Sequence, residues 1–247
     1  LGALVIAVAA IASVGFFVDR MELALERQAS HLLGADLVLA SDRPVDASPI
    51  GSAAAGVSMT RTVVFPSMAA GADGVQLASV KAVGEGYPLR GRLLVRDGLG
   101  ARADVEATGI PAPGEAWLDP QLATALGLDV GDEVELGERM FRIGRIISVE
   151  TDRGTGFVNF APRLMIAEAD LDSTGLLGPA SRASWNLLVA GEPAQVGAVR
   201  ARLEGRLEPG QRLETVTAGR PELSSTLARA EQFLALVALL TALIAAV

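Results

Sequence analysis

Runs without a charged residue open and close this chain, and all the charged residues lie between them. Residues 1–18 read LGALVIAVAAIASVGFFV, and residues 233–247 read FLALVALLTALIAAV. As helices they would extend roughly 27 Å and 22 Å, against a bilayer hydrocarbon core of about 30 Å. The first run is therefore predicted to be a transmembrane helix. The second falls short of a full span, which indicates a second membrane helix that the sequence enters without completing.

Each apolar run is joined to a segment with an amphipathic helical pattern. The first stripe consists of Met21, Leu25, Ala29 and Leu32 and precedes Gly34, a residue type that often ends helices. The second stripe consists of Leu223, Leu227, Ala230 and Leu234. At neither end of the chain does a flexible linker separate the amphipathic stripe from the apolar run beside it. We therefore predict a rigid stalk over 19–34 and, over 220–247, a stalk that runs into the second membrane helix, with Met21, Leu25, Leu223 and Leu227 as candidate coupling residues.

The segment between the stalks has the pattern of a small α/β sandwich. Alternating apolar positions predict strands over 35–41, 60–68 and 75–83, with a weakly helical segment over 48–57 between the first two. Further along, strands are predicted over 183–191 and 212–219, and a helix over 192–207. The stripe of that helix is Val196, Val199, Leu203 and Leu207. We assign 35–86 and 183–219 to one porter-like α/β lobe.

The residues between these two parts, 87–182, have a different character. Asp119 suits an N-cap, Pro120 a first helical position and Gly127 a C-terminal stop, so a short helix is predicted over Pro120–Leu126. Strands within 129–137, 139–150 and 161–167 are separated by Gly and Asp turns. This pattern predicts an inserted β-rich lobe. The predicted fold class is thus an α+β domain flanked by two transmembrane helices.

Composition narrows the possible functions. The net charge of −8 argues against nucleic acid and anionic headgroups as partners, because both require a basic surface. Cysteine is absent, and His31 is the only histidine, lying beside the apolar stripe of the first stalk. A Ser-His-Asp triad or a Cys/His zinc site is therefore not expected. The densest acidic group, Asp129, Asp132, Glu133 and Glu135, is better explained as a solvated turn and strand edge. We expect no catalytic residue, metal or cofactor.

One aromatic segment is a candidate contact surface. The stretch RGTGFVNF, residues 153–160, lacks both the Walker pattern and a following helix, so it is not a nucleotide site. Phe157 and Phe160 are three residues apart, and in a strand they would point to opposite faces. At most one would then be in the core, and the other is a candidate contact for lipid, a hydrophobic substrate or a partner. The alternative is ordinary packing of both rings on an irregular backbone.

Several stretches resemble one family of membrane proteins. They are LLGADLVLAS, GYPLRGRL, LGLDVGDEVELG and APRLMIAEADLDSTGLLGPASR, together with the two helical stalks. Taken together they resemble the FtsX/MacB-type permeases of ABC transporters, and most of all the YbbP-like branch, which accompanies a lysophospholipase-type esterase. The resemblance covers essentially the whole chain.

This resemblance implies a function that the composition alone does not. Such permeases sit in the bacterial inner membrane with an extracytoplasmic domain after the first membrane helix, here residues 19–231. A separate cytoplasmic ATPase would drive movement of that domain, so the permease itself is not an enzyme. The implied substrate is hydrophobic or lipid-linked. Membrane lipid, a periplasmic esterase and a second permease half are the further partners to consider.

Other interpretations remain open at this stage. The sequence AVAAIAS offers the spacing of a signal-peptidase site, so the first apolar run is alternatively a signal peptide. A membrane-anchored sensor also places one extracytoplasmic domain between two membrane helices. A secreted or anchored enzyme is disfavoured because no convincing catalytic set is present.

Overall fold

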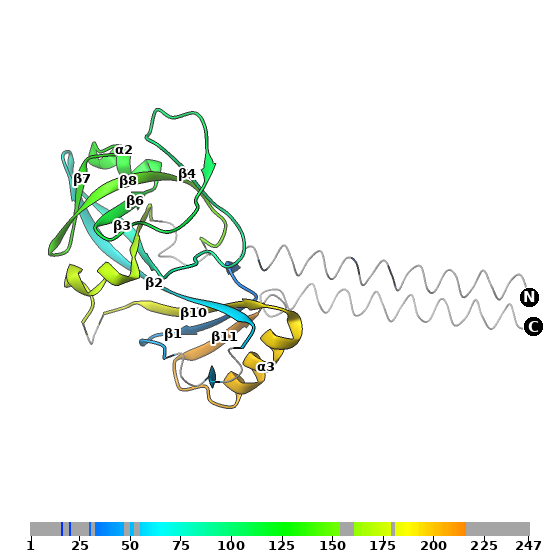
Figure 1. Cartoon of the computed structure of the whole chain (residues 1–247). Coiled ribbons are helices and arrows are strands. Elements are labelled where there is room, and N and C mark those ends of the chain that lie inside the picture. Colours follow the sequence, from blue (N-terminus) through cyan, green and yellow to red (C-terminus); the bar gives the residue numbers. More distant parts are fainter. Residues whose placement is uncertain are drawn as a thin grey trace, which may run out of the picture. The chain divides into compact units, whose positions relative to one another are not determined.

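The computed structural model describes residues 33–46, 50–51, 55–153, 161–178 and 181–215, together with Phe16, Arg20 and Ser30. Residues 30–214 form one compact unit (Figure 1). Its strands are β1 (Leu37–Ser41), β2 (Val57–Gly71), β3 (Gly74–Val83), β4 (Leu93–Arg96), β5 (Val105–Glu106), β6 (Glu115–Leu118), β7 (Glu133–Leu136), β8 (Arg139–Glu150), β9 (Arg163–Ala167), β10 (Ser184–Gly191) and β11 (Gln211–Thr215). Its helices are α2 (Pro120–Leu126) and α3 (Pro193–Glu204), with short 3₁₀ turns η3 (Glu168–Asp170) and η4 (Asp172–Thr174).

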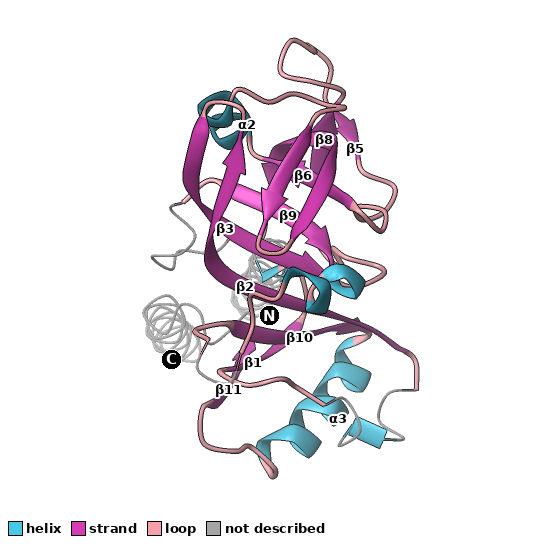
Figure 2. Cartoon of the chain, turned by 90° about the vertical axis from the view of Figure 1, so that its left-hand side faces the viewer, coloured by secondary structure: helices cyan, strands magenta, loops and turns pink. Residues whose placement is uncertain are grey.

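Eleven strands of the described residues form one mixed sheet in the order β11-β1-β10-β2-β3-β9-β6-β8-β4-β5, with β7 pairing to β2 and β8. Strand β2 connects the two parts of this sheet, because its 15 residues are enough to pair with different strands at its two ends. Val57–Val64 pair with β10, whereas Ala69 and Ala70 pair with β7. The β2–β3 hairpin therefore extends through both parts of the sheet (Figure 2).

Helix α3 covers the part of the sheet formed by β1 and β10 (Figure 2). The cluster beneath it consists of Leu37, Leu39, Val45, Ile50, Leu187, Val189, Val199 and Leu203. The helix predicted over 192–207 is confirmed over Pro193–Glu204. The prediction that Leu207 belongs to the apolar stripe of this helix is wrong. Leu207 is 40% exposed, because the helix ends at Glu204 and Leu207 lies in the turn segment that leads to β11.

The second part of the sheet encloses the largest core cluster, which joins α2 to β2, β3 and β6–β9. The short helix predicted over Pro120–Leu126 is confirmed. The Asp119 carboxylate accepts a hydrogen bond from the Gln121 backbone N–H at 2.9 Å, and Gly127 ends the helix with φ at +65°. Leu122 and Leu126 are fully buried. The strands predicted within 129–137, 139–150 and 161–167 are present as β7, β8 and β9.

The acidic group in this region has the predicted turn and surface roles. Asp129 accepts hydrogen bonds from the backbone N–H groups of Leu99 and Val130, and Asp132 accepts one from that of Asp129. Glu133 and Glu135 are exposed. The predicted strand edge is wrong, however. Strand β7 has β8 on one side and β2 on the other, because the long β2–β3 hairpin reaches over to pair with it.

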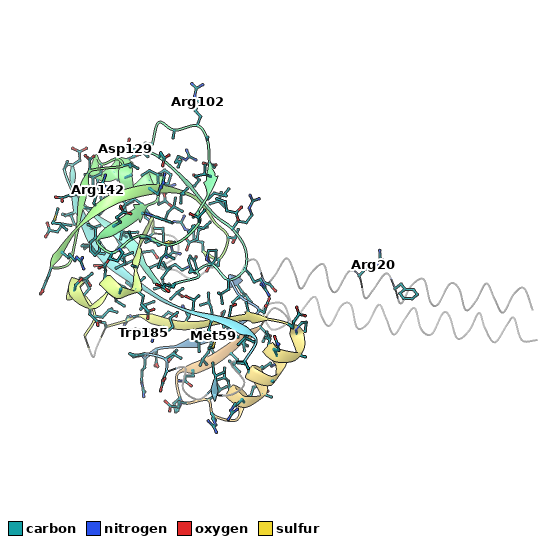
Figure 3. The ribbon with its side chains drawn as sticks, in the orientation of Figure 1. Arg20, Met59, Arg102, Asp129, Arg142 and Trp185 are labelled. Carbon is teal, nitrogen blue, oxygen red and sulfur yellow. The ribbon has the colours of Figure 1, made fainter. Side chains whose placement is uncertain are left out.

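The predicted division into two lobes stays a prediction. Three hydrophobic clusters are present, and the half-buried Trp185 on β10 (Figure 3) packs against both the cluster under α3 and the one around α2. Strands β2 and β3, predicted to lie in the porter-like lobe, also contribute Phe65, Ala78 and Val80 to the cluster around α2.

Several predicted features lie outside the described residues. They are Met21, Leu25, His31, Phe157, Phe160, Leu223, Leu227 and, except for Phe16, both apolar runs. Within the part of the chain that the structure describes, no helix is both long and apolar enough to cross a bilayer.

The cap of α2 supports a first prediction. Besides capping the helix, Asp119 forms an ion pair with Arg153 at 2.7 Å. Asp119→Ala should lower the free energy of unfolding by about 1–2 kcal/mol, because it removes the cap. Asp119→Asn keeps a capping oxygen and should cost less. Thermal unfolding followed by tryptophan fluorescence measures both, and equal losses for the two variants would contradict the capping role.

Candidate functional site

Charged side chains interrupt three otherwise apolar strand segments. Lys81 lies in β3, Arg163 begins β9 and Glu150 ends β8. Strands β3 and β9 are parallel neighbours, which places Ser79 opposite Arg163. Asp152 follows β8 and Tyr87 follows β3. We call Lys81, Tyr87, Glu150, Asp152 and Arg163 the buried ionic cluster, since at most 7% of each side chain is exposed.

The geometry of the cluster satisfies each of its charges. Lys81 Nζ donates to Tyr87 Oη at 2.7 Å, to Glu150 Oε1 at 2.8 Å and to Asp152 Oδ2 at 2.9 Å, which uses all three of its hydrogens. Arg163 donates from Nε to Glu150 Oε2 at 2.8 Å and from a terminal nitrogen to Ser79 Oγ at 2.5 Å. The tyrosine hydroxyl donates to Asp152 Oδ1. Two cations thus face two carboxylates.

Burial and these partners determine the protonation states of Glu150 and Tyr87. Burial alone would raise the pKa of Glu150, but the ammonium of Lys81 and the guanidinium of Arg163 outweigh it and lower that pKa to about 2. The pKa of Tyr87 is raised well above 10, first by burial and then by the charges of Asp152 and Glu150. At neutral pH the carboxylate of Glu150 is therefore ionised and the phenol is neutral.

This arrangement suits a structural role rather than catalysis. Lys81 Nζ is engaged in three hydrogen bonds and its side chain is only 3% exposed, so it is not placed to act as a nucleophile toward a bound substrate. Removing one partner of such a buried set typically costs about 3–5 kcal/mol, because a buried charge is left uncompensated. Among the described residues, no group of three or more His, Cys, Asp or Glu side chains is placed to hold a metal ion. The cluster therefore holds β3, β8, β9 and the loop of Tyr87 in one arrangement.

The cluster packs directly against residues 33–36, where the first predicted stalk ends; we call these four residues the stalk root. Gly34 has φ at +69°, and a Cβ added there would lie 2.6 Å from Asp152 Oδ2. The backbone therefore approaches the carboxylate more closely than any other residue type allows. Ala35 is fully buried and belongs to the same hydrophobic cluster as Tyr87.

A second contact holds the stalk root from the other side. Arg90 binds both carboxylate oxygens of Asp36, at 3.1 Å and 2.8 Å, and its backbone N–H donates to Gly34 O at 2.9 Å. Asp36 Oδ2 also accepts from the backbone N–H of Gly191 at the end of β10, at 3.0 Å. The loop 84–92 is thereby attached to the stalk root and, through Tyr87, to the buried ionic cluster.

The sequence analysis did not predict this site, although two of the stretches that resemble the permease family contain its residues. GADLVLAS contains Gly34 and Asp36, and GYPLRGRL contains Tyr87 and Arg90. A signal was present in the sequence. Lys81 is the single lysine of the chain and stands within the apolar strand VQLASVKAV. A charge at such a position predicts a buried partner, because an isolated buried charge is too costly.

A comparison with known proteins finds a relative along almost the whole chain. The chain is 34% identical over 245 residues to the uncharacterized ABC transporter permease YbbP of Escherichia coli (strain K12). The match covers 98% of this chain and 29% of that permease, so the chain spans less than a third of its relative. The resemblance to the FtsX/MacB-type ABC transporter permeases is confirmed. The matched relative carries the name of a permease, as the resemblance implied. A comparison with protein-family models finds no match.

A solved structure shares the fold of the described residues. The periplasmic region of MacB from Actinobacillus actinomycetemcomitans superposes with a TM-score of 0.53 at 11% identity, covering 79% of this chain and 95% of that one. The extracellular domain of the noncanonic ABC-type transporter YknZ from Gram-positive bacteria gives a TM-score of 0.47 at 11% identity, covering 72% and 100%. The described residues therefore have the fold of the MacB periplasmic region.

The pKa of Glu150 predicts how stability depends on pH. Its folded pKa of about 2 lies below the usual 4.5, so its contribution is complete above about pH 5 and is lost as the pH falls toward 2. This contribution is on the order of 3 kcal/mol. Denaturant unfolding of the wild type and Glu150→Gln should differ by at least that much at pH 7, and the difference should shrink at pH 3.

The exposed Glu106→Gln is the matched control, because its side chain is 59% exposed and should change stability little. An unchanged difference between wild type and Glu150→Gln at the two pH values would contradict the assigned ionisation of Glu150.

Proposed function

We propose that residues 19–231 form an extracytoplasmic domain of an ABC transporter permease in the bacterial inner membrane. In this proposal, helical stalks at both ends pass movement between the domain and a membrane-embedded part. ATP hydrolysis by a separate cytoplasmic ATPase subunit supplies the movement. The matched permease and the MacB periplasmic fold support the proposal. They also favour it over a sensor, since the matched relative is a permease.

The attachment of the stalk root to the domain is the observation that supports the proposed transmission of movement. A helix can transmit displacement only if its end is fixed to the domain that it moves. Gly34 lies against Asp152, and Asp36 is held by Arg90 and by the end of β10. Movement of the stalk root would therefore act on the buried ionic cluster and on three strands at once, rather than bend a loose linker.

The substrate proposed here is hydrophobic or lipid-linked, and membrane lipid is a further contact. A periplasmic esterase and a second permease half are the additional partners. Phe157 and Phe160 are the proposed substrate or partner contacts, and Met21, Leu25, Leu223 and Leu227 the proposed coupling residues of the stalks. These assignments rest on the family resemblance and on the helical pattern.

The test uses the complete permease that contains this chain, coexpressed with an ABC ATPase encoded next to the permease gene. Copurification through a tag on either subunit is the first requirement. Spin labels at Arg20→Cys and Arg102→Cys, both exposed (Figure 3), then report a distance by pulsed electron paramagnetic resonance. We expect the distance distribution to shift between nucleotide-free and vanadate-trapped states. No copurification, or the same distribution in both states, would contradict the proposal.

Arg90→Ala should weaken this shift while the domain stays folded. The Arg90–Asp36 pair is partly exposed, with side-chain exposures of 39% and 21%, so its loss should cost only about 1 kcal/mol. Arg92→Ala is the matched control, because Arg92 contacts the exposed Glu106 and not the stalk root. A flexible Gly-Ser insertion after Arg20 should have the same effect as Arg90→Ala. A full shift in both altered proteins would show that the attachment is irrelevant to coupling.

A further inference from the structure

An exposed apolar surface lies at the end of the β2–β3 hairpin, far along these strands from the buried ionic cluster. Met68, Val75, Leu77 and Met140 are 51%, 56%, 48% and 49% exposed. They are half of the eight large hydrophobic side chains that are exposed among the described residues. Scattered apolar residues on a surface are ordinary, whereas a group of them indicates a binding surface.

Strand register shows that these side chains are neighbours. Met68 pairs with Leu77, and Ala70 with Val75. Ala70 also pairs with Glu135, and Glu135 with Met140, so one row of side chains crosses four strands. Directly paired residues point to the same face with Cβ atoms about 5 Å apart. We call Met68, Ala70, Val75, Leu77 and Met140 the hairpin patch.

A pocket of about 500 Å³ opens beside the hairpin patch. Small and apolar residues form one part of its lining, namely Ala70, Gly71, Ala72, Gly127 and Leu128. Asp132, Glu133 and Glu135 form another part, and Met140 completes the lining. An aliphatic chain that ends in a positive charge fits this combination, because Lys and Arg bury their stems on apolar surface and keep the charged head at a polar rim.

The charge of the surroundings supports a cationic partner. Asp73, in the turn between β2 and β3, is also exposed. Across the described residues, no ion pair is recorded for Asp73, Asp132, Glu133 or Glu135. Of the nearby cations, Arg139 is paired with Asp170 at 2.7 Å, whereas Arg142 lies opposite Glu133 in the strand register and is 3.9 Å from Glu115. The patch thus combines apolar area with the exposed carboxylates of Asp73, Asp132 and Glu135.

We propose that the hairpin patch binds a polypeptide segment of a partner protein that carries apolar residues next to Lys or Arg. The apolar residues cover Met68, Val75 and Leu77, and a basic side chain enters the pocket toward Glu135. The acidic rim disfavours anionic lipid as the occupant. This site is separate from the stalk root, so it can be tested without any assumption about coupling.

The test uses the whole chain in nanodiscs of zwitterionic phosphatidylcholine, with empty nanodiscs subtracted. The probe is a fluorescein-labelled six-residue peptide of alternating leucine and lysine, and binding is followed by fluorescence anisotropy at 150 mM salt. We expect saturable binding that falls about tenfold in Glu135→Lys and about tenfold in the double variant Met68→Ser, Leu77→Ser. The same peptide with glutamate in place of lysine should not bind.

Two matched variants control for charge and apolar area elsewhere. Glu208→Lys reverses an exposed acid, and Val105→Ser removes a 49% exposed apolar side chain, both away from the hairpin patch. Both should bind the lysine peptide within about twofold of wild type, and all variants should keep the wild-type thermal midpoint, since exposed substitutions cost little. Equal binding of the glutamate peptide, or unchanged affinity in both patch variants, would overturn the proposal.

Discussion

Two cations and two carboxylates are buried together in this domain, and their mutual contacts offset the cost of removing each charge from water. Glu150 occupies the central position, because its two oxygens accept from Lys81 and from Arg163. Asp152 and the neutral phenol of Tyr87 complete the set. The desolvation of each charge is offset only when strands β3, β8 and β9 and the loop after β3 are all in place. The cluster thus favours a single arrangement of segments that are far apart in sequence.

The stalk root depends on the same constraint. Gly34 can lie against Asp152 only because that carboxylate is held in place by Lys81 and Tyr87. The loop that carries Tyr87 also carries Arg90, which binds Asp36. The coupling proposed for this domain requires a stiff attachment at this point. A buried, fully hydrogen-bonded ionic set provides more stiffness than apolar packing, since its geometry is directional.

The β2–β3 hairpin connects the buried ionic cluster to the hairpin patch. Lys81 and Val75 lie on the same strand, and six residues of strand span about 20 Å. One end of the hairpin is thus fixed beside the stalk root, while its other end carries the apolar and acidic surface around Met68 and Glu135. Residue pairing along the hairpin is continuous from Thr62–Val83 to Gly71–Gly74, so displacement at one end would be carried to the other.

Local chemistry was sufficient to predict some elements from the sequence. Asp119, Pro120 and Gly127 specify the start and end of α2 within nine residues, and alternating apolar residues located β1, β3, β8 and β10. The same local rules overestimated α3, because Leu207 continues a periodic pattern beyond the point where the helix ends. Likewise, they could not show that β7 is paired on both sides. Lys81 was visible as a charge in an apolar strand, but its partners Glu150 and Asp152 lie 69 and 71 positions away. The sequence by itself therefore determined elements whose signals are local, whereas only the tertiary structure decided which buried charges meet, because their pairing depends on strand order across the whole sheet.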